Sequence, residues 1–231
     1  MTDQAYPEHW LAQVPVPDRS DTLPQSWLKH ANGIGITGQS MPLLSQLIAR
    51  WSEPHRHYHT LRHLQECLQL LEEWGRAHPL RHEIGMALWF HDAIYDPTRP
   101  DNEERSARLA TRALGRAGAD PERVRIVSRF VRATRHGART RSAQGAELML
   151  DIDLAILGAD RARFEDYERQ VRAEFAHVPD DAFARGRAAF VDAMRARPRL
   201  FMTEPGQRLE ARARENLQRS SLRWHRLAAR D

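Results

Sequence analysis

Ile84–Asp96 reads IGMALWFHDAIYD and places a histidine and a carboxylate, His91 and Asp92, at the end of an apolar run. His91 continues the helical face formed by Ile84 and Leu88, so the spacing predicts a helix that turns this histidine toward the core. A buried imidazole beside a buried carboxylate is costly unless both are bound. The stretch therefore predicts a core helix that ends in a binding site.

A second apolar helix is predicted over Tyr58–Leu71 (YHTLRHLQECLQLL). His59 and His63 stand four residues apart on one face of this helix, and Cys67 continues the same stripe. Leucines form another stripe on a different side, so we expect the core to contact the helix on two faces.

Gly75 and the pair His78-Pro79 separate the two helices and are stop and turn signals, which predict a helical hairpin. With its turn near residue 77, His63 and His91 each lie about 14 residues from the turn, or roughly 21 Å along antiparallel helices. The two histidines are then level with each other. Either one alone is most simply a buried histidine with a hydrogen-bond partner. Imidazoles and a carboxylate gathered at one level instead favour a site for a divalent cation.

A third apolar helix, Ala146–Gly158 (AELMLDIDLAILG), is interrupted by Asp151 and Asp153. Two carboxylates within a run of Leu, Met and Ile need partners. Asp153 shares a face with Met149 and Ile156, so we expect Asp153 to point inward as a metal ligand. We expect Asp151 either to support the metal ligands from the next layer of residues or to be the ligand in place of Asp153.

Further candidates lie outside these three helices. The loop that leaves the first helix carries Asp96, Glu103 and Glu104, whose simplest role is at the start of the next helix. They could also hold a metal-bound water or a second cation. His136 stands at the end of a later predicted helix, where a histidine commonly complements the helix dipole, and it is a weaker candidate for the site.

The whole chain has a composition typical of a soluble globular protein. Its 231 residues, 41% hydrophobic and 29% charged, suffice for one large helical domain over 24–231, after an N-terminal arm at 1–23. Amphipathic helices and no strands are predicted for the remainder, so we expect an all-α, single-domain helical bundle. No membrane-spanning run and no secretory pattern is evident, which predicts a cytoplasmic protein.

The charge and the cysteine count exclude some classes of site. The net charge of +4 comes almost wholly from arginine, since Lys29 is the only lysine. Many arginines alternate with acidic residues, as in Glu210–Glu215 (EARARE), which is typical of a solvated helix face rather than of a nucleic-acid surface. The single cysteine, Cys67, excludes an internal disulfide and a zinc site built on several cysteines.

The ordered set of His63, the pair His91-Asp92 and Asp153 resembles the HD superfamily of metal-dependent phosphohydrolases. In that family a histidine, a His-Asp doublet and a distant aspartate hold one divalent metal. The resemblance spans about residues 55–160 and implies a helical bundle of the HD type. Four segments also resemble a group of bacterial proteins described as predicted HD phosphohydrolases: Tyr58–His63, Phe90–Asp96, Asn102–Glu104 and Asp151–Leu154.

The Tyr-His-x-x-x-His segment is similar to that of cyclic nucleotide phosphodiesterases. By that similarity His59 is the proton donor and His63 a metal ligand, while Asp92 takes part in both metal binding and catalysis. Asp96 stands where those enzymes have a further histidine, so a second metal of their kind is not implied. Arg62 is a candidate to clamp a phosphate group, although it equally fits a surface role.

The resemblance implies metal-activated water attack on a phosphomonoester or phosphodiester, for which a nucleotide or a related small phosphorylated molecule is the expected partner. It does not distinguish among Mn, Co, Mg, Ni, Zn and Fe, and a second metal and a homo-oligomer remain open. The main alternative is a regulatory module that binds metal and nucleotide without turnover. A less favoured alternative is a di-iron oxygenase, which would need further ligands such as His136, Glu103 or Glu104.

Overall fold

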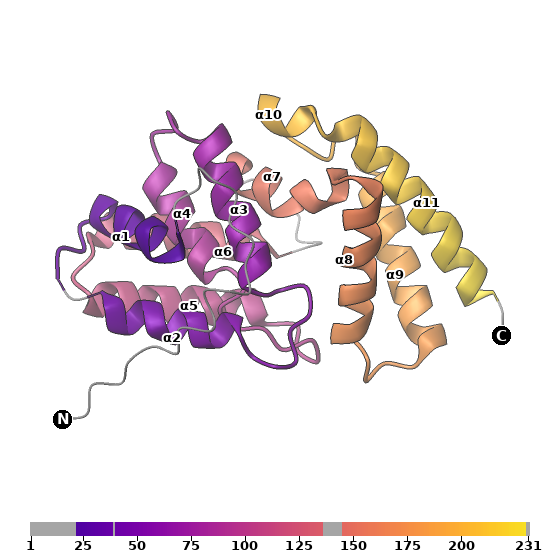
Figure 1. Ribbon diagram of the computed structural model, residues 1–231, viewed down its shortest axis with the longest axis horizontal. Coiled ribbons are helices and arrows are strands. Elements are labelled where there is room, and N and C mark those ends of the chain that lie inside the picture. Colours follow the sequence, from indigo (N-terminus) through magenta and orange to yellow (C-terminus); the bar gives the residue numbers. More distant parts are fainter. Residues whose placement is uncertain (1–21, 39, 136–144, 230–231) are drawn as a thin grey trace.

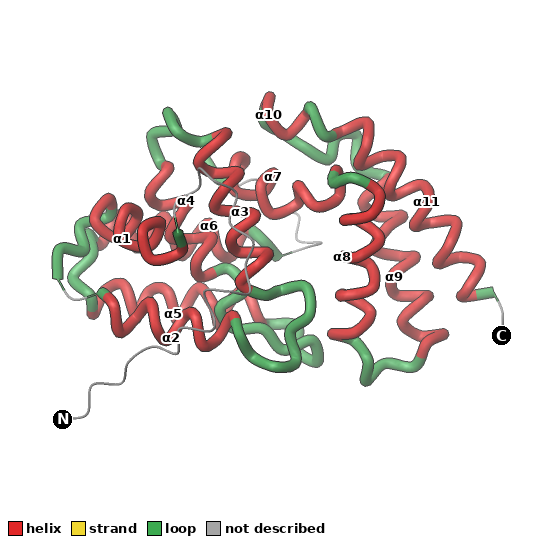
Figure 2. The backbone as a smooth tube through the Cα atoms, viewed as in Figure 1, coloured by secondary structure: helices red, strands yellow, loops and turns green. Residues whose placement is uncertain are grey.

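The computed structural model describes residues 22–38, 40–135 and 145–229. Within these residues the chain forms α-helices and no β-strand, so the predicted all-α class is confirmed (Figures 1 and 2). His136 and almost all of the predicted N-terminal arm lie outside the described residues. None of the described helices is both long and apolar enough to cross a membrane.

The described helices are numbered in chain order. Their bounds are α1 Leu23–Gly33, α2 Met41–Trp51, α3 Leu61–Trp74, α4 Arg81–Phe90, α5 Asn102–Arg116, α6 Pro121–Ala133, α7 Glu147–Leu154, the 3₁₀ turn η2 Ala155–Gly158, α8 Arg161–Glu174, α9 Asp180–Arg195, α10 Glu204–Gln207 and α11 Glu210–Ala228.

The predicted helical hairpin is formed by α3 and α4, which pack against each other around the turn at Gly75. Every residue of α4 from Glu83 to Phe90 is buried, so this helix is central to its part of the fold. Close packing requires a small residue on α4: a Cβ added to Gly85 would lie 2.4 Å from the ring of His30 on α1. The apolar run that contains the His-Asp pair is therefore a core helix.

The hydrophobic core has two parts. The first is built by α1 to α7 and includes Trp89 and Phe130. The second is built mainly by η2, α8, α9 and α11 and includes Phe183 and Trp224. Tyr58, which precedes α3, packs in the second part although α3 itself packs in the first. The turn before α3 therefore lies where the two parts meet, and the candidate site is at this junction.

The predicted start of the second helix is wrong. Tyr58 was expected inside the helix, but α3 begins at Leu61 with Thr60 in an extended conformation before it. The physical reason is tertiary, because the carboxylate of Glu174 on α8 accepts hydrogen bonds from three successive backbone amides before the helix. His59 therefore does not lie on α3, one turn before His63.

Candidate metal centre

Four ionisable side chains meet at the junction, from three separate elements. His63 comes from the middle of α3 and Asp153 from the end of α7. His91 and Asp92 lie in the turn directly after α4, which ends at Phe90, rather than inside a helix. His63 and His91 are almost fully buried, and Asp153 and Asp92 are largely so. The structure thus brings together the four residues that the sequence predicts as metal ligands.

The donor atoms of this cluster are close to one another. Nε2 of His63 lies 3.3 Å from Nε2 of His91 and 3.2 Å from Oδ1 of Asp153. Nε2 of His91 lies 3.4 Å from the same Asp153 oxygen and 3.2 Å from Oδ2 of Asp92. Two imidazole nitrogens and two carboxylate oxygens therefore face one small space.

These separations fit a bound divalent ion. Two atoms that each bind an ion at about 2.1 Å, with an angle between about 90° and about 109° at the ion, lie about 3.0 to 3.4 Å apart. The four measured separations, 3.2 to 3.4 Å, fall within that range. Imidazole nitrogen and carboxylate oxygen are ligand types that first-row divalent metals accept. The residues present therefore fit the group that the resemblance implies.

The tautomer of His91 also fits a role as a metal ligand. Its Nδ1 donates to the carbonyl oxygen of Leu88 at 2.8 Å, so the neutral ring presents the lone pair of Nε2 to the cluster. That lone pair faces the oxygens of Asp92 and Asp153, which are also acceptors. Burial alone would lower the pKa of His91, but the two carboxylates outweigh it and hold the pKa well above its usual value. A cation is required between these groups, and it is either a proton or a metal ion.

The two aspartates of α7 point in different directions. Asp153 faces His63 and His91, as its helical face predicts. Asp151, the expected alternative ligand, is fully buried elsewhere and accepts hydrogen bonds from the backbone amides of Met202 and Thr203 and from the Thr203 hydroxyl. Asp151 therefore anchors the segment before α10 and does not reach the metal cluster.

His59 lies beside the cluster without belonging to it. Its Nε2 is 3.9 Å from Oδ2 of Asp92, and its Nδ1 donates to Oε2 of Glu174 at 2.7 Å. Burial by itself would lower the pKa of His59, but the carboxylates of Glu174 and Asp92 raise it above its usual value. The ring of Tyr95 stacks against His59 at 4.2 Å between centroids. His59 is thus a fixed imidazole that favours the protonated state.

Glu174 is the functional residue that the sequence reasoning missed. Its buried carboxylate accepts from the amides of His57, Tyr58 and His59, from the His59 ring and from the Tyr95 hydroxyl, all between 2.7 and 2.9 Å. Burial opposes ionisation, but His59 and the hydrogen bonds lower the pKa of Glu174 to about 2. A signal was available, because Glu174 falls on the apolar stripe of α8. A carboxylate on such a stripe needs partners.

Arg56 is a second residue that holds the site together. It is buried, and its Nη1 donates to the backbone carbonyls of His59 at 3.1 Å and Asp92 at 2.8 Å, while Nε donates to Glu53. Its guanidinium also lies 5.5 Å from the ring centroid of Trp51. Arg56 therefore ties the segment of His59 to the turn of the His-Asp pair.

The remaining candidates have mostly local partners. Asp96 accepts from the amide and hydroxyl of Thr98. Glu104 pairs with Arg108 and Arg132 on the surface.

Arg62 is half exposed and pairs with Glu66 and Asp166, and it lines neither cavity at the cluster. Glu103 does line a cavity that contains His59 and Asp92. Of these four predicted candidates, only Glu103 therefore shares a space with the cluster.

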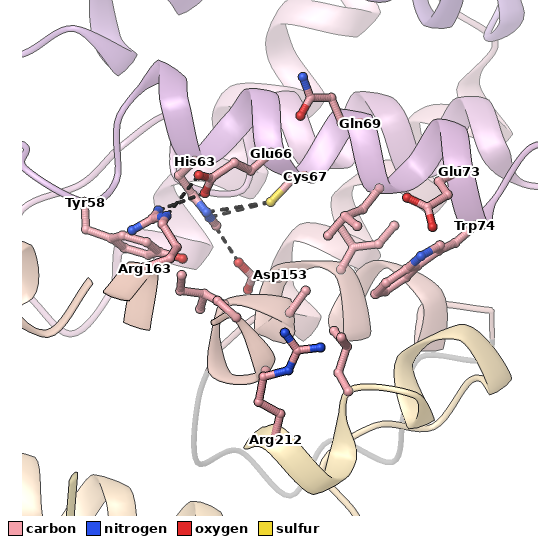
Figure 3. A pocket seen from close by; sticks show the side chains of 17 residues that line it. Tyr58, His63, Glu66, Cys67, Gln69, Glu73, Trp74, Asp153, Arg163 and Arg212 are labelled. Atoms are coloured by element: carbon pink, nitrogen blue, oxygen red, sulfur yellow. Dashed lines mark hydrogen bonds and ion pairs between the residues drawn. The ribbon is translucent and has the colours of Figure 1, made fainter. Parts of the chain in front are cut away.

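Cavities lined by the described residues reach the cluster from two sides. One, of about 440 Å³, opens beside Cys67 and is lined by His63, Asp153 and Arg163; we call it the Cys67 cavity (Figure 3). Sγ of Cys67 lies 3.7 Å from Nδ1 of His63, and its thiol is buried, which raises its pKa.

The other cavity, of about 220 Å³, is lined by His59, Asp92 and Asp153 together with Tyr95, Tyr167 and Arg187; we call it the His59 cavity. It is smaller than the Cys67 cavity, yet it combines Asp92 and Asp153 of the cluster with the imidazole of His59. We therefore regard the His59 cavity as the candidate ligand site.

No protein-family model matches the chain, and no curated protein and no solved structure matches it. The resemblance to the HD superfamily therefore rests on the sequence motifs alone.

Proposed function

We propose that the protein is a metal-dependent phosphohydrolase that cleaves a phosphate ester of a small molecule. The observation that carries the proposal is the composition of the His59 cavity. Its wall contains Asp92 and Asp153 of the candidate metal cluster and, 3.9 Å from Asp92, an imidazole whose pKa is raised. A cation-binding group and a proton donor in one small space are what hydrolysis of a phosphate ester requires.

Each residue then has a defined task. His63, His91, Asp92 and Asp153 would hold the divalent ion, which would supply Lewis-acid stabilisation of negative charge on phosphorus and lower the pKa of a bound water. The oxygen of a water molecule bonds to phosphorus as the phosphorus–oxygen ester bond breaks, and this water releases one proton to solvent. The leaving oxygen takes the proton of His59 Nε2, and solvent restores that proton.

Glu174 and Arg56 act as positioning residues. Because the Glu174 carboxylate accepts from Nδ1 of His59, the proton available for transfer is at Nε2, the nitrogen on the side of Asp92. Because Arg56 bonds the carbonyls of both His59 and Asp92, the proton donor and the metal cluster keep a fixed separation. The precision that this confers is worth a large part of the rate in such reactions.

The test is phosphate release from phosphomonoesters, nucleotides and cyclic nucleotides by protein loaded with Mn²⁺, Co²⁺ or Mg²⁺. We expect release with at least one substrate, and a fall of about 10²-fold to 10⁴-fold in turnover for His59→Gln with metal content unchanged. His57→Gln is the matched control, because the side chain of His57 is exposed. Metal-loaded protein that binds a nucleotide and leaves it intact would overturn the proposal and support the regulatory module.

A further inference from the structure

The His59 cavity contains a guanidinium as well as the metal cluster. Among the described residues that line it, Arg187 of α9 carries the one permanent positive charge. The reaction scheme above uses the metal cluster and His59 and gives Arg187 no task. A positive charge in the wall of a reaction cavity, away from the residues that would hold the metal, calls for its own explanation.

Glu168 and Tyr167 of α8 fix the orientation of the Arg187 guanidinium. The residue is only 8% exposed, and both Nε and Nη2 donate to Oε1 of Glu168, while Nη2 also donates to the hydroxyl of Tyr167 at 2.8 Å. The second oxygen of Glu168 accepts from Ser220 and from the indole of Trp224. Ser220 and Trp224 hold the Glu168 carboxylate, and this carboxylate in turn holds the guanidinium through Nε and Nη2. The guanidinium is thus fixed while Nη1 takes no part in these hydrogen bonds.

One nitrogen of Arg187 remains for a ligand. Among the described residues Nη1 has no hydrogen-bond partner, whereas Nε and Nη2 are both engaged. Nη1 is also not among the side-chain atoms that are sealed from solvent without a partner, such as the ring nitrogens of His30. Part of the Nη1 surface is therefore accessible to solvent, and the cavity that Arg187 lines is the His59 cavity.

The rest of the cavity wall limits the size of a ligand. Tyr95, Tyr167, Phe175 and Phe190 contribute aromatic surface, and the volume is about 220 Å³. Pockets for drug-sized ligands are typically about 300 to 1,000 Å³. A compact molecule therefore fits best, with one charged end at the metal cluster and another at the guanidinium.

We infer that the substrate is a compact phosphate ester that carries a second anionic group, a carboxylate or a further phosphate, bound by Nη1 of Arg187 while its phosphoryl group lies at the metal cluster. The inference rests on the proposed function for the placement of the phosphoryl group, and adds the second charge as the feature that selects the substrate. Arginine is suited to this role because it stays ionised and because its planar guanidinium, held by Glu168 and Tyr167, keeps the N–H groups of Nη1 in a fixed direction.

Non-hydrolysable probes separate binding from turnover. The probes are phosphonocarboxylic acids with one to three carbons between the two acidic groups, each paired with the alkylphosphonate of the same length. Their affinities for Mn²⁺-loaded protein are measured by calorimetry. We expect the phosphonocarboxylate of one length to bind about tenfold to a hundredfold more tightly than its alkyl partner. Arg187→Gln should abolish that advantage, and Arg187→Lys, which keeps the charge without the planar fork, should retain part of it.

Arg185→Gln is the matched control, since Arg185 lies on the same helix but is exposed and pairs with Asp181. It should keep the full advantage. If alkylphosphonates bind wild-type protein and the carboxylate adds nothing at any length, the role of Arg187 is refuted while the proposed function stands. That comparison needs no variant, so it decides the question even if the Arg187 variants do not fold. If neither series binds the Mn²⁺-loaded protein and no phosphate ester is cleaved, the proposed function itself fails.

Discussion

Replacement of Glu174 by glutamine should destabilise the protein by an amount that depends on pH. In the folded protein the pKa of this carboxyl is lowered from 4.5 to about 2. At about 1.4 kcal/mol per pH unit, that shift corresponds to about 3 kcal/mol of stability that the ionised carboxylate contributes near neutral pH. For a chain of this size the loss should lower the melting temperature by about 6 to 12 °C.

The sign of the pH dependence follows from the direction of the shift. A group with a lowered pKa in the folded state contributes fully above its unfolded value, here 4.5, and the contribution is lost as the pH falls toward about 2. Glu174→Gln lacks this contribution at every pH. The difference in unfolding free energy between wild type and variant should therefore be largest at pH 7 and shrink steadily below pH 4.5.

The assay is urea unfolding of both proteins, followed by tryptophan fluorescence at pH 7, 5, 4 and 3. Glu165→Gln serves as the control, because Glu165 is on the same helix but is exposed and pairs with Arg161 one turn away. Its midpoint should not move. If the free energy of unfolding of Glu174→Gln lies within about 0.5 kcal/mol of wild type at pH 7, the ionised Glu174 carboxylate does not contribute the expected stability. A difference that stays constant down to pH 3 would show that lost packing, and not charge, is responsible.

Three further changes test other parts of the account. Asp151→Asn should lower the melting temperature and leave the metal content intact, whereas Asp153→Asn should lose the metal; equal metal loss in both would contradict the different orientations of these side chains. Gly85→Ala should cost about 1 to 3 kcal/mol in urea unfolding because its Cβ would meet the ring of His30 at 2.4 Å, and a variant as stable as wild type would disprove this tight contact. Arg56→Lys should reduce turnover of an identified substrate with metal content retained, since the single nitrogen of lysine cannot span acceptors that Arg56 reaches with two different nitrogens; unchanged turnover would remove its positioning role.

The all-helical class and the meeting of His63 with the His91-Asp92 pair could be predicted because both follow from local patterns, whereas the place of Asp153 in the same cluster was implied by the resemblance to the HD superfamily. Helical periodicity is strong in the apolar runs, and equal distances from one hairpin turn bring His63 and His91 together. The same periodicity favours Asp153 as the inward-facing residue and leaves Asp151 as the alternative. These inferences need only the spacing of residues along helices that do form.

The position of His59 and the role of Glu174 could not be predicted in the same way. The two residues are 115 positions apart, and their contact depends on how α8 packs against the turn before α3. The Glu174 carboxylate accepts hydrogen bonds from the backbone amides of that turn. These residues therefore do not join the helix that the local sequence favours. A tertiary contact thus overrides a local propensity at the position of His59, the proposed proton donor. Arg187 is a similar case, because only the packing of α9 brings it to the same cavity.

Elemental analysis of the purified protein shows whether the cluster of His63, His91, Asp92 and Asp153 binds a divalent metal ion. The protein is equilibrated with Mn²⁺, Co²⁺ or Zn²⁺, passed through a desalting column and analysed together with His91→Ala and the surface variant His57→Gln. If these four residues hold a metal, wild type and His57→Gln should each contain one divalent ion per chain, and His91→Ala should have lost the ion. Wild-type protein that retains none of these metals, or a His91→Ala variant that retains as much as wild type, would contradict metal binding by this cluster.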